Sequence, residues 1–144
     1  MLRNAIVLPM LLISLLCNAC MAQNNSNKEA GGDRDSHGCI GSAGYLWSEL
    51  KEKCIRLFED GIRLDPKAEG LDQTTVAYIV FKSLDEDAKV ELFVPGEKAA
   101  LLPKVGKDDA GTWKNKKYVL KQWRGMYSLE DSKGKVLYEG SAVK

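Results

Sequence analysis

The feature that most constrains this chain is a succession of short β-type segments between residues 74 and 140. The segment TTVAYIVF, residues 74–81, is rich in β-branched and aromatic residues and is apolar on both faces, which predicts a central strand. Turn-forming residues then recur at a spacing of about 8–12 residues, which is typical of an antiparallel meander that closes into a small barrel or sandwich. The other expected strands span residues 89–94, 98–103, 117–123, 125–131 and 135–140.

Residues 45–58 fit two local structures. As a hairpin, they would form strands at 45–50 and 54–58 around a polar turn, and the strongly β sequence that follows favours this interpretation. Added to the six later strands, the hairpin would give a mainly β fold of about eight strands. The alternative is a short helix within 45–60 that ends near Gly61, because five residues fall at helical spacing: Trp47, Leu50, Cys54, Leu57 and Phe58. Asp65-Pro66 and Gly70 then indicate a loop.

Residues 1–22 have the pattern of an export signal. A short basic region at Arg3 precedes an apolar run over residues 5–16, which is shorter than the roughly 20 residues of a membrane span. Ala19 directly before Cys20 is typical of a bacterial lipoprotein signal, in which the cysteine becomes the lipidated first residue. We favour this interpretation over cleavage after Ala22, which would release a secreted protein.

The mature chain divides into a tether and one domain. Residues 23–37 contain no large apolar side chain, so we expect a flexible tether there. Residues 38–144 have the length of a single globular domain.

The two remaining cysteines, Cys39 and Cys54, predict a structural disulfide. An isolated pair in an exported domain normally oxidises, and closing a loop of about 15 residues stabilises a fold by roughly 3 kcal/mol. A zinc site would need about four ligands. The chain has one histidine, His37, which could be joined only by Asp33 and Asp35 of the tether. We therefore expect no metal site, no catalytic cysteine and no redox pair.

Composition and motifs argue against several function classes. The chain has 21 basic and 20 acidic residues, and only one basic residue, Arg3, precedes the tether, so the mature chain is balanced. That balance predicts no binding to nucleic acid or to an anionic membrane surface. The domain lacks a histidine for a catalytic triad, a P-loop and a dinucleotide fingerprint. We expect no enzyme and no cofactor, and we expect these aromatic residues to fill the barrel or cap its ends: Trp113, Tyr118, Trp123, Tyr127 and Tyr138.

One long stretch resembles a motif of small exported proteins of Gram-negative bacteria. It spans residues 38–64 and reads GCIGSAGYLWSELKEKCIRLFEDGIRL, with Ser-Ala-Gly-Tyr, Trp-Ser, Cys-Ile-Arg and Gly-Ile-Arg-Leu as its distinctive parts. The resemblance implies the cell envelope of such a bacterium, in the periplasm or at the outer membrane, with attachment to the membrane only through the N-terminal lipid.

A second stretch is similar in pattern to the membrane-bound inhibitors of c-type lysozyme, which are periplasmic lipoproteins with an eight-stranded antiparallel barrel. The similar parts are VELFVPGEKAALL, the loop KVGKDDAGT, Tyr118 and QWRGMYSL. The resemblance implies a binding site made of Arg124, Trp123, Tyr118 and a loop at residues 107–111 that begins with Lys107. In that family a loop serine and a lysine enter the lysozyme cleft, and Arg124 stands at the position of the lysine.

The chain departs from that family at two places. The loop contains Asp108 and Asp109 but no serine, and Trp123-Arg124-Gly125 is one residue shorter than the family's Trp-x-Lys-Gly. Two hypotheses follow. The chain is an exported, non-enzymatic binding module that inhibits a lysozyme-like hydrolase by inserting a loop. Alternatively, it is an envelope lipoprotein with a structural or protein-interaction role and no enzyme target.

Overall fold

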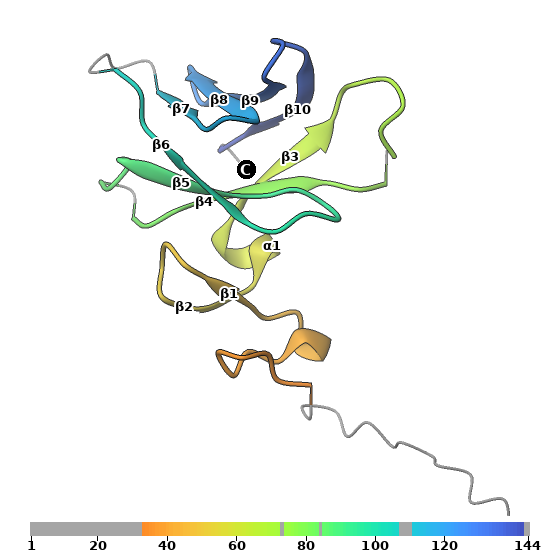
Figure 1. Ribbon diagram of the computed structural model, residues 1–144, viewed down its shortest axis with the longest axis vertical. Coiled ribbons are helices and arrows are strands. Elements are labelled where there is room, and N and C mark those ends of the chain that lie inside the picture. Colours follow the sequence, from red (N-terminus) through yellow and green to blue (C-terminus); the bar gives the residue numbers. More distant parts are fainter. Residues whose placement is uncertain (1–32, 73, 84, 107–110, 143–144) are drawn as a thin grey trace, which may run out of the picture.

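The computed structural model describes residues 33–72, 74–83, 85–106 and 111–142. They form a mainly β structure with a separate two-stranded hairpin and an eight-stranded antiparallel sheet (Figure 1). The elements in chain order are η1 (Gly41–Ala43), β1 (Leu46–Ser48), β2 (Lys53–Ile55), α1 (Leu57–Asp60), β3 (Ile62–Pro66), β4 (Ala77–Phe81), β5 (Lys89–Phe93), β6 (Ala100–Pro103), β7 (Thr112–Lys114), β8 (Tyr118–Trp123), β9 (Met126–Asp131) and β10 (Val136–Ser141).

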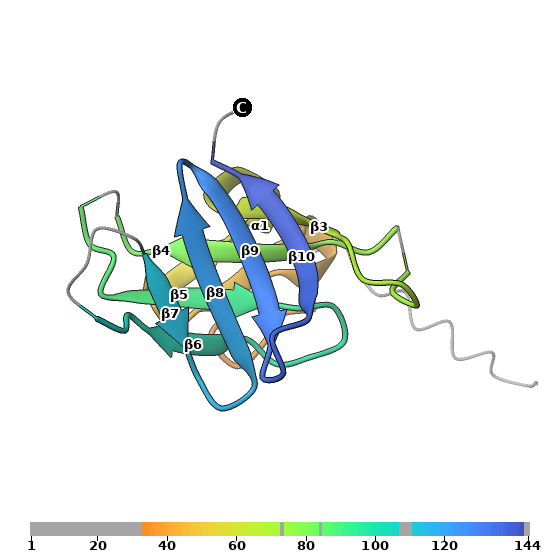
Figure 2. The ribbon, with the colours of Figure 1, turned by 90° about the horizontal axis from the view of Figure 1, so that it is seen from above.

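The large sheet has the order β6-β5-β4-β3-β10-β9-β8-β7 and curls into a nearly closed barrel. Figure 2 shows β6 and β7, the two edge strands, side by side. Near this seam the Val105 amide donates to the Thr112 carbonyl at 2.7 Å, and Lys104 and Trp113 form an isolated antiparallel bridge. The predicted small antiparallel barrel is therefore confirmed.

The membership of the barrel differs from the sequence prediction. The β1–β2 hairpin exists, but it pairs with no strand of the large sheet. Its place in the count of eight is taken by β3 and β7, neither of which was predicted as a strand. β3 ends in Asp65-Pro66, residues that usually mark turns, but here they pair with Glu139 and Tyr138 of β10.

The helical elements are short. α1 lies within the range predicted for a short helix, and the Gly61 amide closes it by donating to the Leu57 carbonyl at 2.9 Å. Both interpretations of residues 45–60 are thus partly right, because a hairpin is followed directly by one helical turn. In the described part of the chain, no helix is long and apolar enough to cross a membrane.

The barrel interior is filled by side chains that alternate along the strands, as the period of two requires. Trp113, Tyr118 and Tyr138 are buried there, as expected for aromatic residues of a barrel core. The other fully buried members are Leu64, Ala77, Ile79, Val90, Leu92, Leu102, Leu120 and Leu129.

The hairpin covers the outer face of β4 and β5 (Figure 1). Val80 and Glu91 are opposite each other on these strands, and both are buried although they lie outside the barrel core. The Glu91 carboxylate accepts hydrogen bonds from the Ser48 hydroxyl, from the Glu49 amide at 3.0 Å and from the Leu50 amide at 3.4 Å. A buried carboxylate satisfied in this way fixes the hairpin to the barrel.

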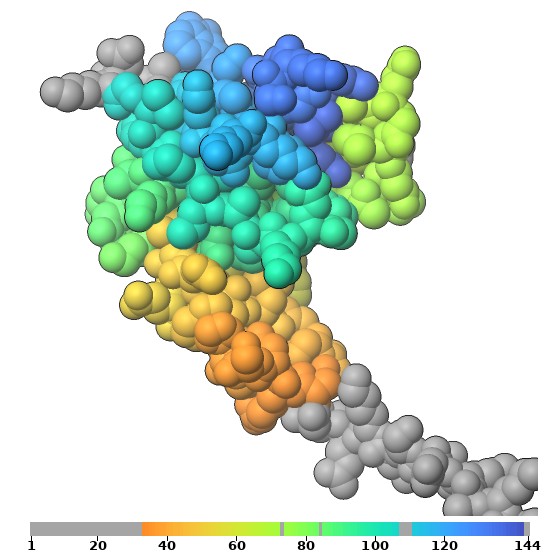
Figure 3. All heavy atoms as spheres, viewed as in Figure 1, coloured from red at the N-terminus to blue at the C-terminus, as the bar shows by residue number. Residues whose placement is uncertain are grey.

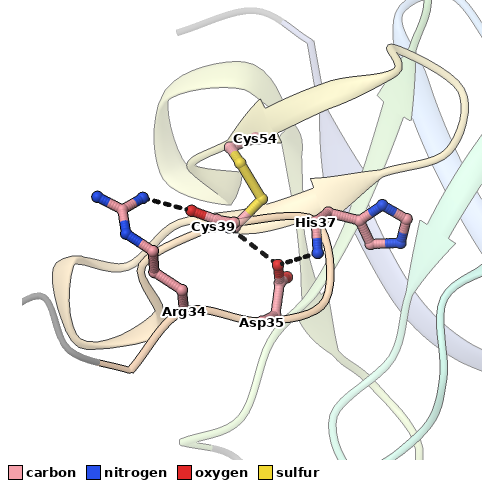
Figure 4. Close-up of a disulfide and its surroundings, with 6 residues drawn as sticks. Arg34, Asp35, His37, Cys39 and Cys54 are labelled. Carbon is pink, nitrogen blue, oxygen red and sulfur yellow. Dashed lines mark hydrogen bonds between the residues drawn. A yellow bond between two sulfur atoms is a disulfide. The ribbon is translucent and has the colours of Figure 1, made fainter.

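The predicted disulfide is present. It joins Cys39 to Cys54 of β2, and the two Cα atoms are 5.5 Å apart. As Figure 4 shows, the Asp35 carboxylate accepts from the amides of His37 and Cys39, and the Arg34 guanidinium donates to the Gly38 carbonyl.

Residues 33–37, assigned to the tether from the sequence, make specific contacts. The Asp33 carboxylate accepts from the amide and hydroxyl of Ser42, and the His37 ring stacks on Trp47 with centroids 4.3 Å apart. The contacts of the folded part therefore already include residues 33–37, before Gly38. Together with the hairpin, this segment forms a lobe beside the barrel (Figure 3).

Candidate binding site at one end of the barrel

One end of the barrel brings together segments that are distant in the sequence. The turn between β8 and β9 lies there, and two backbone hydrogen bonds attach its neighbours. The Gln122 amide donates to the Gly111 carbonyl at 2.7 Å, and the Ala142 amide donates to the Gly125 carbonyl at 3.1 Å. Gly111, the described end of the loop that follows β6, is thus bonded to Gln122, which directly precedes Trp123 in the chain.

The β8–β9 turn, residues 123–126, has an unusual backbone. Trp123 pairs with Met126, and the two residues between them, Arg124 and Gly125, have φ values of 49° and 81°. Positive φ at both central positions is the pattern of a type I′ turn, which normally prefers Asn-Gly. An arginine in this conformation costs about 1 kcal/mol, and such residues are concentrated at ligand-binding sites.

The turn exposes a large apolar surface next to a cation. Trp123 is 66% exposed and Met126 is 50% exposed. The Arg124 guanidinium lies 5.3 Å from the centre of the Trp123 ring, and no carboxylate of the described segments forms an ion pair with it. Exposed Trp, Met and Arg are the residue types enriched where proteins bind proteins.

Beside the turn, the barrel end contains an open cavity of about 260 Å³, which we call the mouth cavity. Three aromatic rings form part of its lining. The Phe81 ring lies 5.3 Å from that of Trp113 at 65°, and 5.9 Å from that of Tyr127 at 46°. The complete lining is Ile62, Phe81, Ser83, Asp87, Gly111, Trp113, Gln122, Tyr127 and Ala142.

Two polar contacts hold one wall of the mouth cavity. The Trp113 indole donates to the Asp87 carbonyl at 2.6 Å, and the Asp87 carboxylate pairs with Lys104. Burial of Tyr127, with a smaller contribution from the Asp87 charge, raises the pKa of its phenol. The phenol therefore keeps its proton at neutral pH and can donate a hydrogen bond.

Tyr118 lies away from this site. It is 5% exposed and begins β8, whereas Trp123 ends that strand. Its hydroxyl donates to the Glu97 carboxylate at 2.9 Å, and Lys117 donates to the same oxygen at 2.6 Å. Burial raises the pKa of Tyr118, and the Lys117 hydrogen bond lowers the pKa of Glu97. Tyr118 thus belongs to the core, and its hydroxyl is bonded to the loop between β5 and β6.

Other predicted site residues lie outside the described part of the chain. These are Lys107, with the acidic pair at 108 and 109, and the lipidation candidate Cys20. No role was predicted from the sequence for Met126, Phe81 and Gln122. Gln122 and Met126 flank the β8–β9 turn, and the curvature of the sheet brings Phe81 of β4 to the same end. Exposure of Met126 could have been expected from strand alternation, since it pairs with Trp123.

The described residues contain no group of three or more histidine, cysteine or acidic side chains that could hold a metal ion. No protein-family model matches the chain, and no curated protein and no solved structure is similar to it.

Proposed function

We propose that this chain is a non-enzymatic binding module that contacts a protein partner through the β8–β9 turn. The observation that carries the proposal is the exposed Trp123, with the Arg124 guanidinium 5.3 Å from the centre of its ring and in no ion pair with a carboxylate of the described residues. The aromatic ring supplies apolar area with little conformational freedom to lose, and the guanidinium supplies donors for a carboxylate.

The partner favoured by this chemistry has acidic groups within a cleft. A turn of two residues projects from the sheet and is narrow enough to enter such a cleft, where Arg124 would meet a carboxylate. The catalytic groups of glycoside hydrolases are a pair of carboxylates. We therefore propose a lysozyme-like hydrolase as the partner and inhibition as the result, in accordance with the resemblance of residues 89–140 to lysozyme inhibitors.

An inhibition assay tests this proposal. The protein is mixed with c-type, g-type and i-type lysozymes, and lysis of a peptidoglycan suspension is followed. We expect inhibition of at least one class, and we expect Trp123→Ala and Arg124→Ala each to weaken it about 30-fold, as for a binding hot spot. Lys133→Ala is the matched control, because Lys133 is an exposed cation in the turn at the opposite end of β9. If no lysozyme is inhibited at micromolar excess, the partner is not a lysozyme.

The strained backbone provides a second test at the same residue. Arg124→Asn places a residue suited to positive φ in the turn, so we expect unfolding free energy to rise by about 0.5–1 kcal/mol while binding is lost. Arg124→Lys keeps a charge and the strain, and we expect it to leave stability unchanged. Urea unfolding of the parent, R124N and R124K proteins measures these differences in unfolding free energy. A destabilised R124N variant would contradict the assignment of strain to Arg124.

A further inference from the structure

The mouth cavity carries an inference that goes beyond the proposed protein partner. We infer that it is a binding site for one neutral, hydroxylated six-membered ring, that is, a single sugar unit. Three properties lead to this assignment: the size of the cavity, the arrangement of its polar groups and its charge.

The size and the apolar walls suit a single ring. A cavity of about 260 Å³ lies just below the roughly 300–1,000 Å³ of pockets for drug-sized ligands. The rings of Phe81, Trp113 and Tyr127 stand at steep angles to one another, so they form walls of the hollow and not a closed stack. Aromatic surfaces of this kind can pack against the C–H groups of a saturated ring.

Three polar side chains that line the mouth cavity are available to hydrogen-bond a ligand. The Gln122 amide group, the Tyr127 hydroxyl and the Ser83 hydroxyl form no hydrogen bond with any side chain or backbone group of the described residues. All three residues line the hollow, and Gln122 and Tyr127 are half-buried whereas Ser83 is exposed. Amide and hydroxyl groups both donate and accept, as sugar hydroxyls do.

The charge of the described lining disfavours charged ligands. Among the described lining residues the one acidic side chain, Asp87, is already paired with Lys104, and the Lys104 ammonium also lies 5.7 Å from the centre of the Trp113 ring. A cationic ligand would have to displace this lysine, and an anionic ligand would approach the Asp87 carboxylate. The site therefore favours a neutral molecule.

Nuclear magnetic resonance titration of the full chain tests the inference, with D-glucose and N-acetyl-D-glucosamine as probes. We expect saturable shifts of the amide signals of Gly111, Gln122 and Tyr127 and of the Trp113 indole signal. The affinity should be on the order of millimolar, as befits a ligand of a dozen or so heavy atoms. Tyr127→Phe removes only the hydroxyl, and Gln122→Ala removes the amide together with one methylene group. Each should weaken binding about fivefold.

Controls separate this site from the rest of the molecule. Tyr45→Phe is the matched control, because Tyr45 lies in the N-terminal lobe under the Arg56 guanidinium, and it should bind both sugars normally. R124N should also bind them normally, so the sugar test can fail or succeed independently of the protein-partner proposal. Absence of saturable shifts at roughly 100 mM sugar would overturn the inference. The inference would also be overturned if Y127F and Q122A bound the sugars as well as the parent does, or if R124N failed to bind them. An affinity for cyclohexanol equal to that for the sugars would overturn it too.

Discussion

Gly140→Ala should strongly destabilise this protein. A Cβ atom at this position of β10 would lie 2.0 Å from the Arg63 carbonyl oxygen and 2.8 Å from Leu64 Cδ2. The first of these atoms belongs to the backbone of β3, so no side-chain rotation can relieve the overlap. We expect a loss of about 4 kcal/mol in unfolding free energy and a melting temperature lower by more than about 10 °C.

The size of this effect follows from the position of the β3–β10 contact in the sheet. These two strands join the half made of β4, β5 and β6 to the half made of β7, β8 and β9. Gly41→Ala is the matched control, because its Cβ would meet only Asp33 Oδ2, at 3.4 Å, and we expect a change within about 0.5 kcal/mol. Thermal unfolding of both variants measures the difference. A G140A protein as stable as the parent would show that β3 and β10 lie farther apart.

Glu91→Ala should detach the N-terminal hairpin. The substitution leaves the buried Ser48 hydroxyl and the Glu49 and Leu50 amides without their common acceptor, and it leaves a void on the outer face of β5. We expect a loss of about 3 kcal/mol, measured by urea unfolding. Hydrogen exchange should show the cause directly, because the Glu49 and Leu50 amides should lose protection while the barrel amides retain it.

Three further variants make this prediction specific. Glu91→Gln keeps the shape and one acceptor, so it should cost about 1–2 kcal/mol, less than the alanine variant. Ser48→Ala should cost less in the E91A protein than in the parent, with a coupling of about 1 kcal/mol, because the two groups share a hydrogen bond. Glu86→Ala removes an exposed glutamate that pairs with Lys82 and with no other cation of the described segments, and it should change stability by less than about 0.5 kcal/mol. Equal losses for E86A and E91A would mean that Glu91 does not hold the hairpin.

The buried Glu91 also shows where reasoning from sequence alone stops. A glutamate in a strand is normally taken as solvent-facing, and Glu91 does point away from the barrel core. It is nevertheless 1% exposed, because the hairpin covers that outer face. The apolar character of both faces of residues 74–81 has the same cause, since Ile79 faces the interior and Val80 lies under the cover of the hairpin.

Strand alternation explains which predicted site residues belong together. Tyr118 and Trp123 are five positions apart on one strand, so they point to opposite faces. Tyr118 shares the inner face with Leu120, and Trp123 is exposed on the outer face. The sequence alone shows that these two side chains lie on opposite faces of the strand. Which face is buried could be decided only once the strand was known to form part of a barrel wall.

The sequence by itself determined the features that depend on near neighbours in the chain. The antiparallel β class follows from the period of apolar residues and turns. The Cys39–Cys54 bond was predicted because these are the two cysteines that remain once residues 1–22 are taken as an export signal. Only the tertiary structure decided which strands meet, because pairing between distant segments leaves no mark within a window of ten residues. It made strands of residues that usually form turns, at Asp65-Pro66, and it placed Phe81, Gln122 and Tyr127 around one cavity. These outcomes depend on closure of the sheet, where the burial gained by the whole barrel outweighs local preference.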